Sequence, residues 1–335
     1  MVISLRNGDC AATRLFFHIL ASALLIALAC LSSQAGDLQT RQLVVTASKQ
    51  TDAPAFSHYG LALSDNNGDL FFHVGGDVFT NATIMKLAHS SLERTLYKLP
   101  SDLQQTKYQF YEFAVSPTGD LWMLANAGPA VSVVAFDSDG QESGRTKLDI
   151  SLADVNITDL TAFDNDLLFF AGATIGKDAG HPFAALVNGG TGKTIRMWHD
   201  VFPAAKDAVP IHAGNASVGD DGNVYLLNES EVVAISPAGE VIKRVKFVKP
   251  DQTLIPFLVR ASSGYAAVWL RTPPQKDHTL EVSYVVLDLS SGKTLGWYAP
   301  PADIRVPAMS FSRNNGFEFL VAKHGKLNLI EADLR

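Results

Sequence analysis

The 335-residue chain is 47% hydrophobic and 18% charged, with 25 Gly, 15 Pro and two Cys. These proportions exclude a disordered, a collagen-like or a disulfide-stapled chain, so its stability must come from a large apolar core. The formal net charge is −7 and no long basic run occurs, so neither a nucleic-acid surface nor an anionic-membrane surface is expected.

Residues 1–35 have the pattern of a targeting segment. Two arginines precede an uncharged run from Leu15 to Leu31, and Ser33 and Ala35 are the small residues at −3 and −1 of a cut before Gly36. This order predicts a signal peptide cleaved after Ala35 and a secreted or periplasmic mature chain. Two alternatives stay open, a lipid anchor on Cys30 and an uncleaved membrane anchor. No later run is as long and apolar, so no membrane span is predicted in the mature chain.

A unit of four short strands recurs from about residue 40 onward. Three clear copies of its first two strands lie at 61–72, 113–124 and 216–227, and three weaker copies lie at 160–170, 258–270 and 310–321. The turn positions within these copies, 68, 119, 166, 222, 264 and 316, are 42 to 56 residues apart. Four strands in about fifty residues are typical of a propeller blade, so six blades are predicted.

A second set of turns joins the third strand of a unit to the fourth. Glycines at 140, 192, 239 and 292 supply the positive φ angles that such hairpins need. The segment Gly189–Thr194 looks like a phosphate-binding loop, but its glycine spacing is wrong and a similar Ser290–Thr294 follows one hundred residues later. We therefore interpret it as a repeat hairpin.

The chain ends predict how the ring closes. The sixth unit reaches only its third strand, while 42–48 forms an extra strand before the first unit, so we expect residues 43–47 to become the outer strand of the last blade. With this pattern the sequence resembles the six-bladed β-propeller superfamily, in the neighbourhood of NHL-repeat, TolB-like and gluconolactonase-like propellers. The resemblance covers about residues 40–335. It implies an all-β fold of four-stranded antiparallel blades and very little chemistry, because it rests on the blade pattern and not on a catalytic motif.

The predicted organisation is a signal peptide, 1–35, and one propeller domain, 36–335. The predicted blades span approximately 56–99, 108–150, 156–200, 212–248, 255–299 and 306–335 together with 42–48.

Three oxygen-bearing side chains are candidate metal ligands. Superposing the innermost strands places one residue of each blade at the entry to the central channel: Gly60, Glu112, Asp159, Asn215, Phe257 and Ala308. Glu112, Asp159 and Asn215 come from successive blades and offer the oxygens that Ca²⁺ or Mg²⁺ takes. The gluconolactonase-like resemblance implies a catalytic divalent metal near the channel. The alternative is that these polar groups cap loops at the strand starts.

Two histidines are weaker candidates. His58 and His212 each lie ten residues before a turn glycine, in blades one and four, and a neutral imidazole there would serve as a general base or a ligand. The alternative is that both are ordinary surface residues. Long blade connections at 99–111, 198–214 and 298–307 would form a binding surface on one face of the ring.

The leading interpretation is an exported, monomeric, non-catalytic propeller that binds a small-molecule ligand or a protein partner through this loop face, with no cofactor. The alternative is a divalent-metal-dependent hydrolase of the lactonase kind with Ca²⁺ or Mg²⁺ at the channel. A third interpretation, a purely structural scaffold, also stays open.

Overall fold

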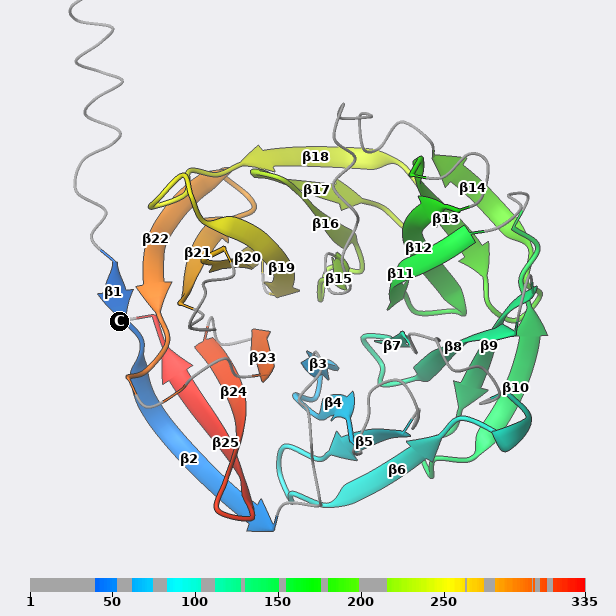
Figure 1. The fold of residues 1–335 in the computed structure, drawn as a ribbon, viewed down its shortest axis with the longest axis horizontal. Coiled ribbons are helices and arrows are strands. Elements are labelled where there is room, and N and C mark those ends of the chain that lie inside the picture. Colours follow the sequence, from blue (N-terminus) through cyan, green and yellow to red (C-terminus); the bar gives the residue numbers. More distant parts are fainter. Residues whose placement is uncertain are drawn as a thin grey trace, which may run out of the picture. The chain divides into compact units, whose positions relative to one another are not determined.

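Small sheets of short strands are arranged around a central channel like the blades of a ring (Figure 1). The computed structural model describes residues 40–52, 62–74, 83–103, 112–127, 130–150, 155–175, 180–198, 216–262, 264–273, 281–302, 304, 308–311 and 316–334. These residues form six sheets, each with four antiparallel strands, and the inner strands contact one another in ring order. The predicted all-β fold of six four-stranded blades is confirmed.

Blades one to three follow one another along the chain. Blade one contains β3 (Ala62–Ser64), β4 (Leu70–His73), β5 (Thr83–Leu87) and β6 (Arg94–Lys98). Blade two contains β7 (Phe113–Val115), β8 (Leu121–Ala127), β9 (Ala130–Phe136) and β10 (Glu142–Lys147), and the short 3₁₀ helix η1 (Ser101–Leu103) precedes it. Blade three contains β11 (Val155–Ala162), β12 (Leu167–Thr174), β13 (Pro182–Asn188) and β14 (Thr194–Trp198).

Blades four to six complete the ring. Blade four contains β15 (Ala216–Val218), β16 (Val224–Asn228), β17 (Glu231–Ile235) and β18 (Val241–Lys246). Blade five contains β19 (Ile255–Ser262), β20 (Tyr265–Arg271), β21 (Val282–Asp288) and β22 (Lys293–Ala299). Blade six contains β23 (Ala308–Phe311), β24 (Gly316–Lys323) and β25 (Lys326–Asp333).

An N-terminal strand supplies the fourth strand of blade six. β2 (Val44–Asp52) pairs antiparallel with β25, from Val44 opposite Asp333 to Asp52 opposite Lys326, so the predicted ring closure is confirmed. The preceding β1 (Arg41–Gln42) pairs parallel with β22 and adds a fifth strand to blade five. Leu43, between the two strands, is only 2% exposed and packs in the apolar cluster between blades five and six.

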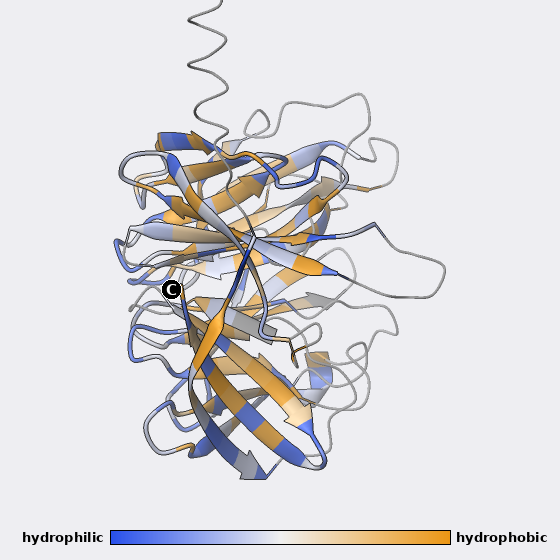
Figure 2. Cartoon of the chain, turned by 90° about the vertical axis from the view of Figure 1, so that its left-hand side faces the viewer, coloured by the Kyte–Doolittle hydropathy of each residue, from blue (hydrophilic) through white to orange (hydrophobic). Residues whose placement is uncertain are grey.

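Apolar clusters lie between neighbouring blades all round the ring. Each of the six clusters of buried side chains in the described residues joins two adjacent blades, as Phe71 and Met123 do for blades one and two. Figure 2 shows hydrophobic and hydrophilic residues alternating along some of the strands, as expected for a sheet with one polar face. The strands in the middle of the blades differ, because five consecutive residues of β12 and five of β20 are buried. Both faces of a blade are buried there, and the blades hold one another without disulfide bonds.

The predicted turn glycines are mostly confirmed. Positive φ angles occur at the first-turn glycines 68, 119, 222 and 264 and at the second-turn glycines 140, 192, 239 and 292. In blade three, Asn165 and Asp166 adopt positive φ angles in place of glycine. The prediction for blade six was wrong, because Gly316 is the first residue of β24 and does not belong to the turn. The phosphate-loop-like segment 189–194 is the β13–β14 hairpin, as predicted.

No helix in the described part of the chain is long and apolar enough to cross a membrane. Residues 1–39, including Cys30, lie outside the described residues, so the signal peptide and export stay predictions.

Candidate functional site

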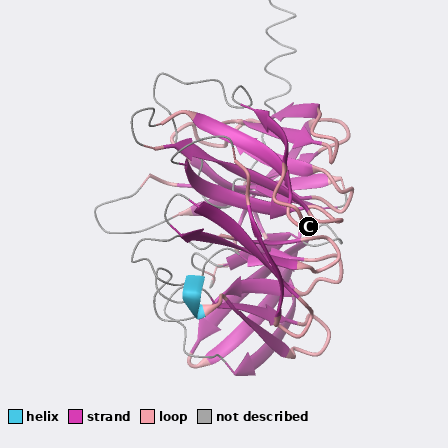
Figure 3. Ribbon diagram, turned by 90° about the vertical axis from the view of Figure 1, so that its right-hand side faces the viewer, coloured by secondary structure: helices cyan, strands magenta, loops and turns pink. Residues whose placement is uncertain are grey.

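A polar pocket lies at one end of the central channel. The turns that follow the inner strands gather on one face of the ring (Figure 3). There the ends of the inner strands and their turns enclose a cavity of about 480 Å³. All six blades contribute to its wall, with residues such as Leu63, Val115, Thr161, Ser217 and Arg260 from blades one to five and Phe311 from blade six.

Carboxylates dominate the charged wall of this pocket. Its described lining includes five acidic side chains, against one arginine and one histidine: Asp65, Asp220, Glu318, Glu331, Asp333, Arg260 and His89. Such an excess makes the electrostatic potential of a concave site negative. The pocket is therefore suited to a ligand that carries positive charge or donates hydrogen bonds.

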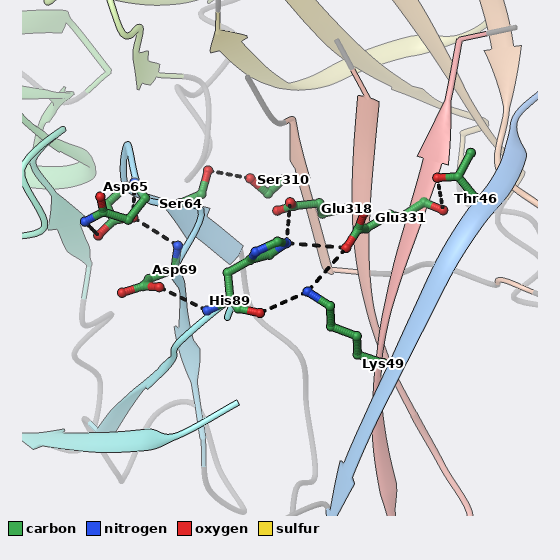
Figure 4. Close-up of polar contacts among 10 residues, drawn as sticks. Thr46, Lys49, Ser64, Asp65, Asp69, His89, Ser310, Glu318 and Glu331 are labelled. Atoms are coloured by element: carbon green, nitrogen blue, oxygen red, sulfur yellow. Dashed lines mark hydrogen bonds and ion pairs between the residues drawn. The ribbon is translucent and has the colours of Figure 1, made fainter. Parts of the chain in front are cut away.

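Two glutamates of blade six face each other across adjacent strands, and we call Glu318 and Glu331 the carboxylate pair. Glu318 on β24 lies directly opposite Glu331 on β25. His89, from the turn between β5 and β6 of blade one, places Nε2 3.6 Å from Oε1 of Glu318 and 3.4 Å from Oε1 of Glu331 (Figure 4). Lys49 on β2 places Nζ 3.7 Å from Oε1 of Glu331 and donates to the carbonyl oxygen of His89.

The turn of blade one fixes His89 beside the pair. The Oδ1 of Asp65 accepts hydrogen bonds from the backbone N–H groups of Asn67 and Asp69, at 2.8 and 3.0 Å, which locks the turn after β3. The carboxylate of Asp69 in turn accepts the backbone N–H of His89 at 3.0 Å and forms an ion pair with Lys86 at 2.8 Å. Burial raises the pKa of Asp65, although these backbone donors oppose the rise.

Glu318 is more deeply buried than Glu331. Its side chain is 6% exposed, and burial raises the pKa of its carboxyl to about 7, helped by the charge of Glu331 and opposed by Lys49. Its Oε2 atom is buried and has no hydrogen-bond partner among the residues that the structure describes. This carboxyl can therefore exchange a proton near neutral pH, and it keeps one acceptor oxygen for another molecule.

Arg260 crosses the channel from blade five to blade one. It is 4% exposed, and its Nε and Nη2 atoms donate to the carbonyl oxygen of Ala62 on β3, at 3.3 and 3.1 Å. Its Nη1 donates to the carbonyl oxygen of Val259 at 2.9 Å. Burial lowers the pKa of Arg260 to about 10 and the negative charge of Asp159 opposes this, so the guanidinium stays charged at neutral pH.

The structure puts two of the three predicted metal ligands at equivalent places. The backbone N–H groups of Ser116 and Phe163 close the first hairpins of blades two and three, and Glu112 and Asp159 lie four residues before them. Asn215 lies outside the described residues, as do His58 and His212. In blade five Leu258 takes the position predicted for Phe257, because Ser262 pairs with Tyr265, only three residues on, and the hairpin is one residue shorter than those of blades two and three.

Glu112 and Asp159 differ in their surroundings. The partly buried carboxyl of Glu112 makes no hydrogen bond or ion pair within the described part of the chain, and burial raises its pKa to about 8. Asp159 is 2% exposed and interacts electrostatically with Arg260. Among the residues that the structure describes, no group of three or more His, Cys, Asp or Glu side chains could hold a metal ion.

Sequence reasoning missed the residues of the pocket. The only local signals were Arg260 within an otherwise apolar strand and Glu318 between two phenylalanines. His89 carries no local signal, because its partners Glu318 and Glu331 lie at the other end of the chain. Their juxtaposition depends on strand register and ring closure.

Comparisons with known proteins support the fold alone. No family model and no curated protein sequence matches the chain. Among solved structures, a gluconolactonase from Xanthomonas campestris is similar, with 13% identity, 88% of this chain and 96% of that chain covered, and a TM-score of 0.50. A regucalcin, described as a calcium-binding protein, from Agrobacterium tumefaciens has 12% identity, coverage of 89% and 98%, and a TM-score of 0.49. The WD40 domain of Neurospora crassa Pan2 has 9% identity, coverage of 89% and 97%, and a TM-score of 0.49.

The chain is therefore a six-bladed β-propeller, and its resemblance to this superfamily is confirmed at the level of the fold. Since the same fold serves both enzymes and binding proteins, function has to be argued from the site.

Proposed function

We propose that the protein is a non-catalytic propeller that binds a small polar ligand in the pocket at one end of its channel, where the turns after the inner strands lie. The observation that carries this proposal is the pocket itself, a cavity of about 480 Å³ walled by all six blades. Its volume falls in the range of small-molecule sites, which combine apolar walls with a few fixed polar groups. The long blade connections that sequence analysis favoured as a binding surface lie largely outside the described residues, so that surface stays a prediction.

Filling the pocket should abolish binding. Val218 lines the pocket and is only partly buried, so Val218→Trp is expected to occupy the cavity without opening the core. We expect that at least one of three five-carbon probes, 5-aminopentan-1-ol, pentane-1,5-diol or glutarate, raises the melting temperature of the wild type and leaves that of Val218→Trp unchanged. Circular dichroism of the variant checks the fold. Equal stabilisation of both proteins, or of neither, would contradict the proposal.

A second candidate is the divalent-metal-dependent hydrolase of the lactonase kind. One observation favours it: Glu112, directly before the innermost strand β7, has a partly buried carboxyl with no partner among the described residues, at the position equivalent to Asp159 in the adjacent blade. These two side chains would offer a hard cation carboxylate oxygens, and Asn215 would offer an amide oxygen. Bound there, the metal would supply Lewis-acid polarisation of a substrate carbonyl. The charge of Arg260 beside Asp159 opposes a second cation.

Removing the Glu112 carboxylate tests this candidate. If the metal site exists, Ca²⁺ or Mg²⁺ raises the melting temperature of the wild type at pH 8.5 and has no effect on Glu112→Gln. Without metal, the pKa of this group is about 8 in the folded protein and 4.5 ordinarily, so its contribution to stability is lost as pH rises through 8. Glu112→Gln should therefore lose less stability than the wild type between pH 6 and pH 8.5. A wild type that no divalent ion stabilises contradicts the metal site.

A further inference from the structure

The carboxylate pair is a local electrostatic conflict. Glu318 and Glu331 lie directly opposite each other on β24 and β25, and like charges in that position destabilise a sheet. An arrangement of this kind persists only where other charges compensate for it. One compensating charge, that of Lys49, comes from β2, and the imidazole of His89 from blade one lies beside the pair as well.

The compensation is incomplete on the inner side of the pair. Lys49 and His89 both approach Oε1 atoms, at distances of 3.4 to 3.7 Å. Oε2 of Glu318 has almost no exposed surface, in a side chain that is 6% exposed, and it accepts no hydrogen bond from the described residues. An unmade hydrogen bond at a buried polar group is costly, and more so at a charged group. Glu318 lines the pocket, so a molecule inside the pocket can supply the missing donor once the carboxylate turns Oε2 toward it.

The pocket chemistry favours an ammonium group as that donor. An alkylammonium carries positive charge and three N–H donors, which suit a wall rich in carboxylate oxygens. Lys49 already shows such a group in the same cluster, between Oε1 of Glu331 and the carbonyl oxygen of His89. Apolar side chains that include Leu63, Val218 and Phe311 also line the pocket and would contact the alkyl chain.

We propose that the carboxylate pair binds the protonated amino group of a small primary amine, whose alkyl part lies in the pocket and whose ammonium donates to Oε2 of Glu318. This inference rests on the proposed binding function and names its ligand class.

The proposal has a consequence for pH dependence. Among the described residues, the groups next to Glu318 that titrate or carry charge are Glu331 on β25, Lys49 on β2 and His89 from blade one. The same pocket wall also holds Arg260, Asp65, Asp220 and Asp333. The pKa of Glu318 is raised to about 7, and an ammonium ligand binds the ionised carboxylate. Affinity should therefore rise severalfold between pH 6 and pH 8, where a primary amine of pKa near 10 remains protonated.

Calorimetric titration of the full-length protein with 5-aminopentan-1-ol tests the proposal. We expect binding that Glu318→Gln weakens by about tenfold or more, as is usual when a charged hydrogen-bonding partner is removed. The pH dependence should disappear in the same variant. Glu240→Gln is the matched control, because Glu240 is exposed in the hairpin between β17 and β18 and is not among the residues that line the pocket. This variant should bind the amine as the wild type does. A merely structural role for Glu318 would not remove the pH dependence of binding.

The controls separate this inference from the binding function. If pentane-1,5-diol or glutarate binds the wild type as tightly as the amine, and Val218→Trp blocks that binding, ammonium recognition is wrong and the pocket function stands. Displacement of the amine by Ca²⁺ or Mg²⁺ in a Glu318-dependent manner would assign the pair to a metal ion instead. If none of the three probes binds, or binding survives Val218→Trp, both proposals fall.

Discussion

Arg260→Ala is expected to lower the free energy of unfolding by about 3–5 kcal/mol, the usual cost of removing one partner from a buried charge interaction. The variant would leave Asp159, which is 2% exposed, without the guanidinium charge that stabilises its ionised form. It would also remove the donors to the carbonyl oxygens of Ala62 and Val259. Chemical denaturation at pH 7 measures the change.

The double variant Arg260→Met with Asp159→Asn is the control for this result. Because it removes both charges and keeps most of the side-chain volume, we expect it to recover a large part of the loss. If the free energy of unfolding of Arg260→Ala lies within about 1 kcal/mol of the wild-type value, the guanidinium does not link blades five and one structurally.

Leu43→Ala should cost about 2–5 kcal/mol of unfolding free energy, the range for truncating a buried leucine. Leu43 is 2% exposed and packs in the cluster between blades five and six, between the two strands that the N-terminal segment contributes. Val45→Ala, two residues further on, is the matched control because Val45 is 48% exposed and should change stability by less than about 0.5 kcal/mol.

Equal effects of the two alanine variants would show that the N-terminal segment is not anchored through Leu43. Denaturant titrations of both proteins, run at one protein concentration, give the comparison directly.

The ring could be predicted because its signals are local. A turn glycine needs only its own φ angle, and the repeat spacing needs only the count of residues between turns. Gly119 illustrates this, with a φ of 96° in the turn that the sequence predicted. Even the replacement of glycine by Asp166 was readable, since Asp tolerates the left-handed region better than most residues.

The site could not be predicted to the same extent because its contacts depend on register. The hairpin after β19 is one residue shorter than those of blades two and three, and this places Leu258 instead of Phe257 at the position equivalent to Asp159. The pairing of Glu318 with Glu331 depends on the alignment of β24 with β25. His89 joins them only because blades one and six meet where the ring closes. Single-sequence patterns carry no information about these three conditions.

The closure of blade six also determines when the ring can finish folding during synthesis. Asp52 on β2 and its partner Lys326 on β25 are 274 residues apart, so β2 emerges from the ribosome long before the strand it pairs with. Contacts over such separations are slow to form, and a strand that has not yet found its partner can pair with strands of other chains. The valines at 44 and 45 remain about half exposed even in the finished blade. The interval between the synthesis of β2 and of β25 is therefore the period in which this protein most needs protection from aggregation.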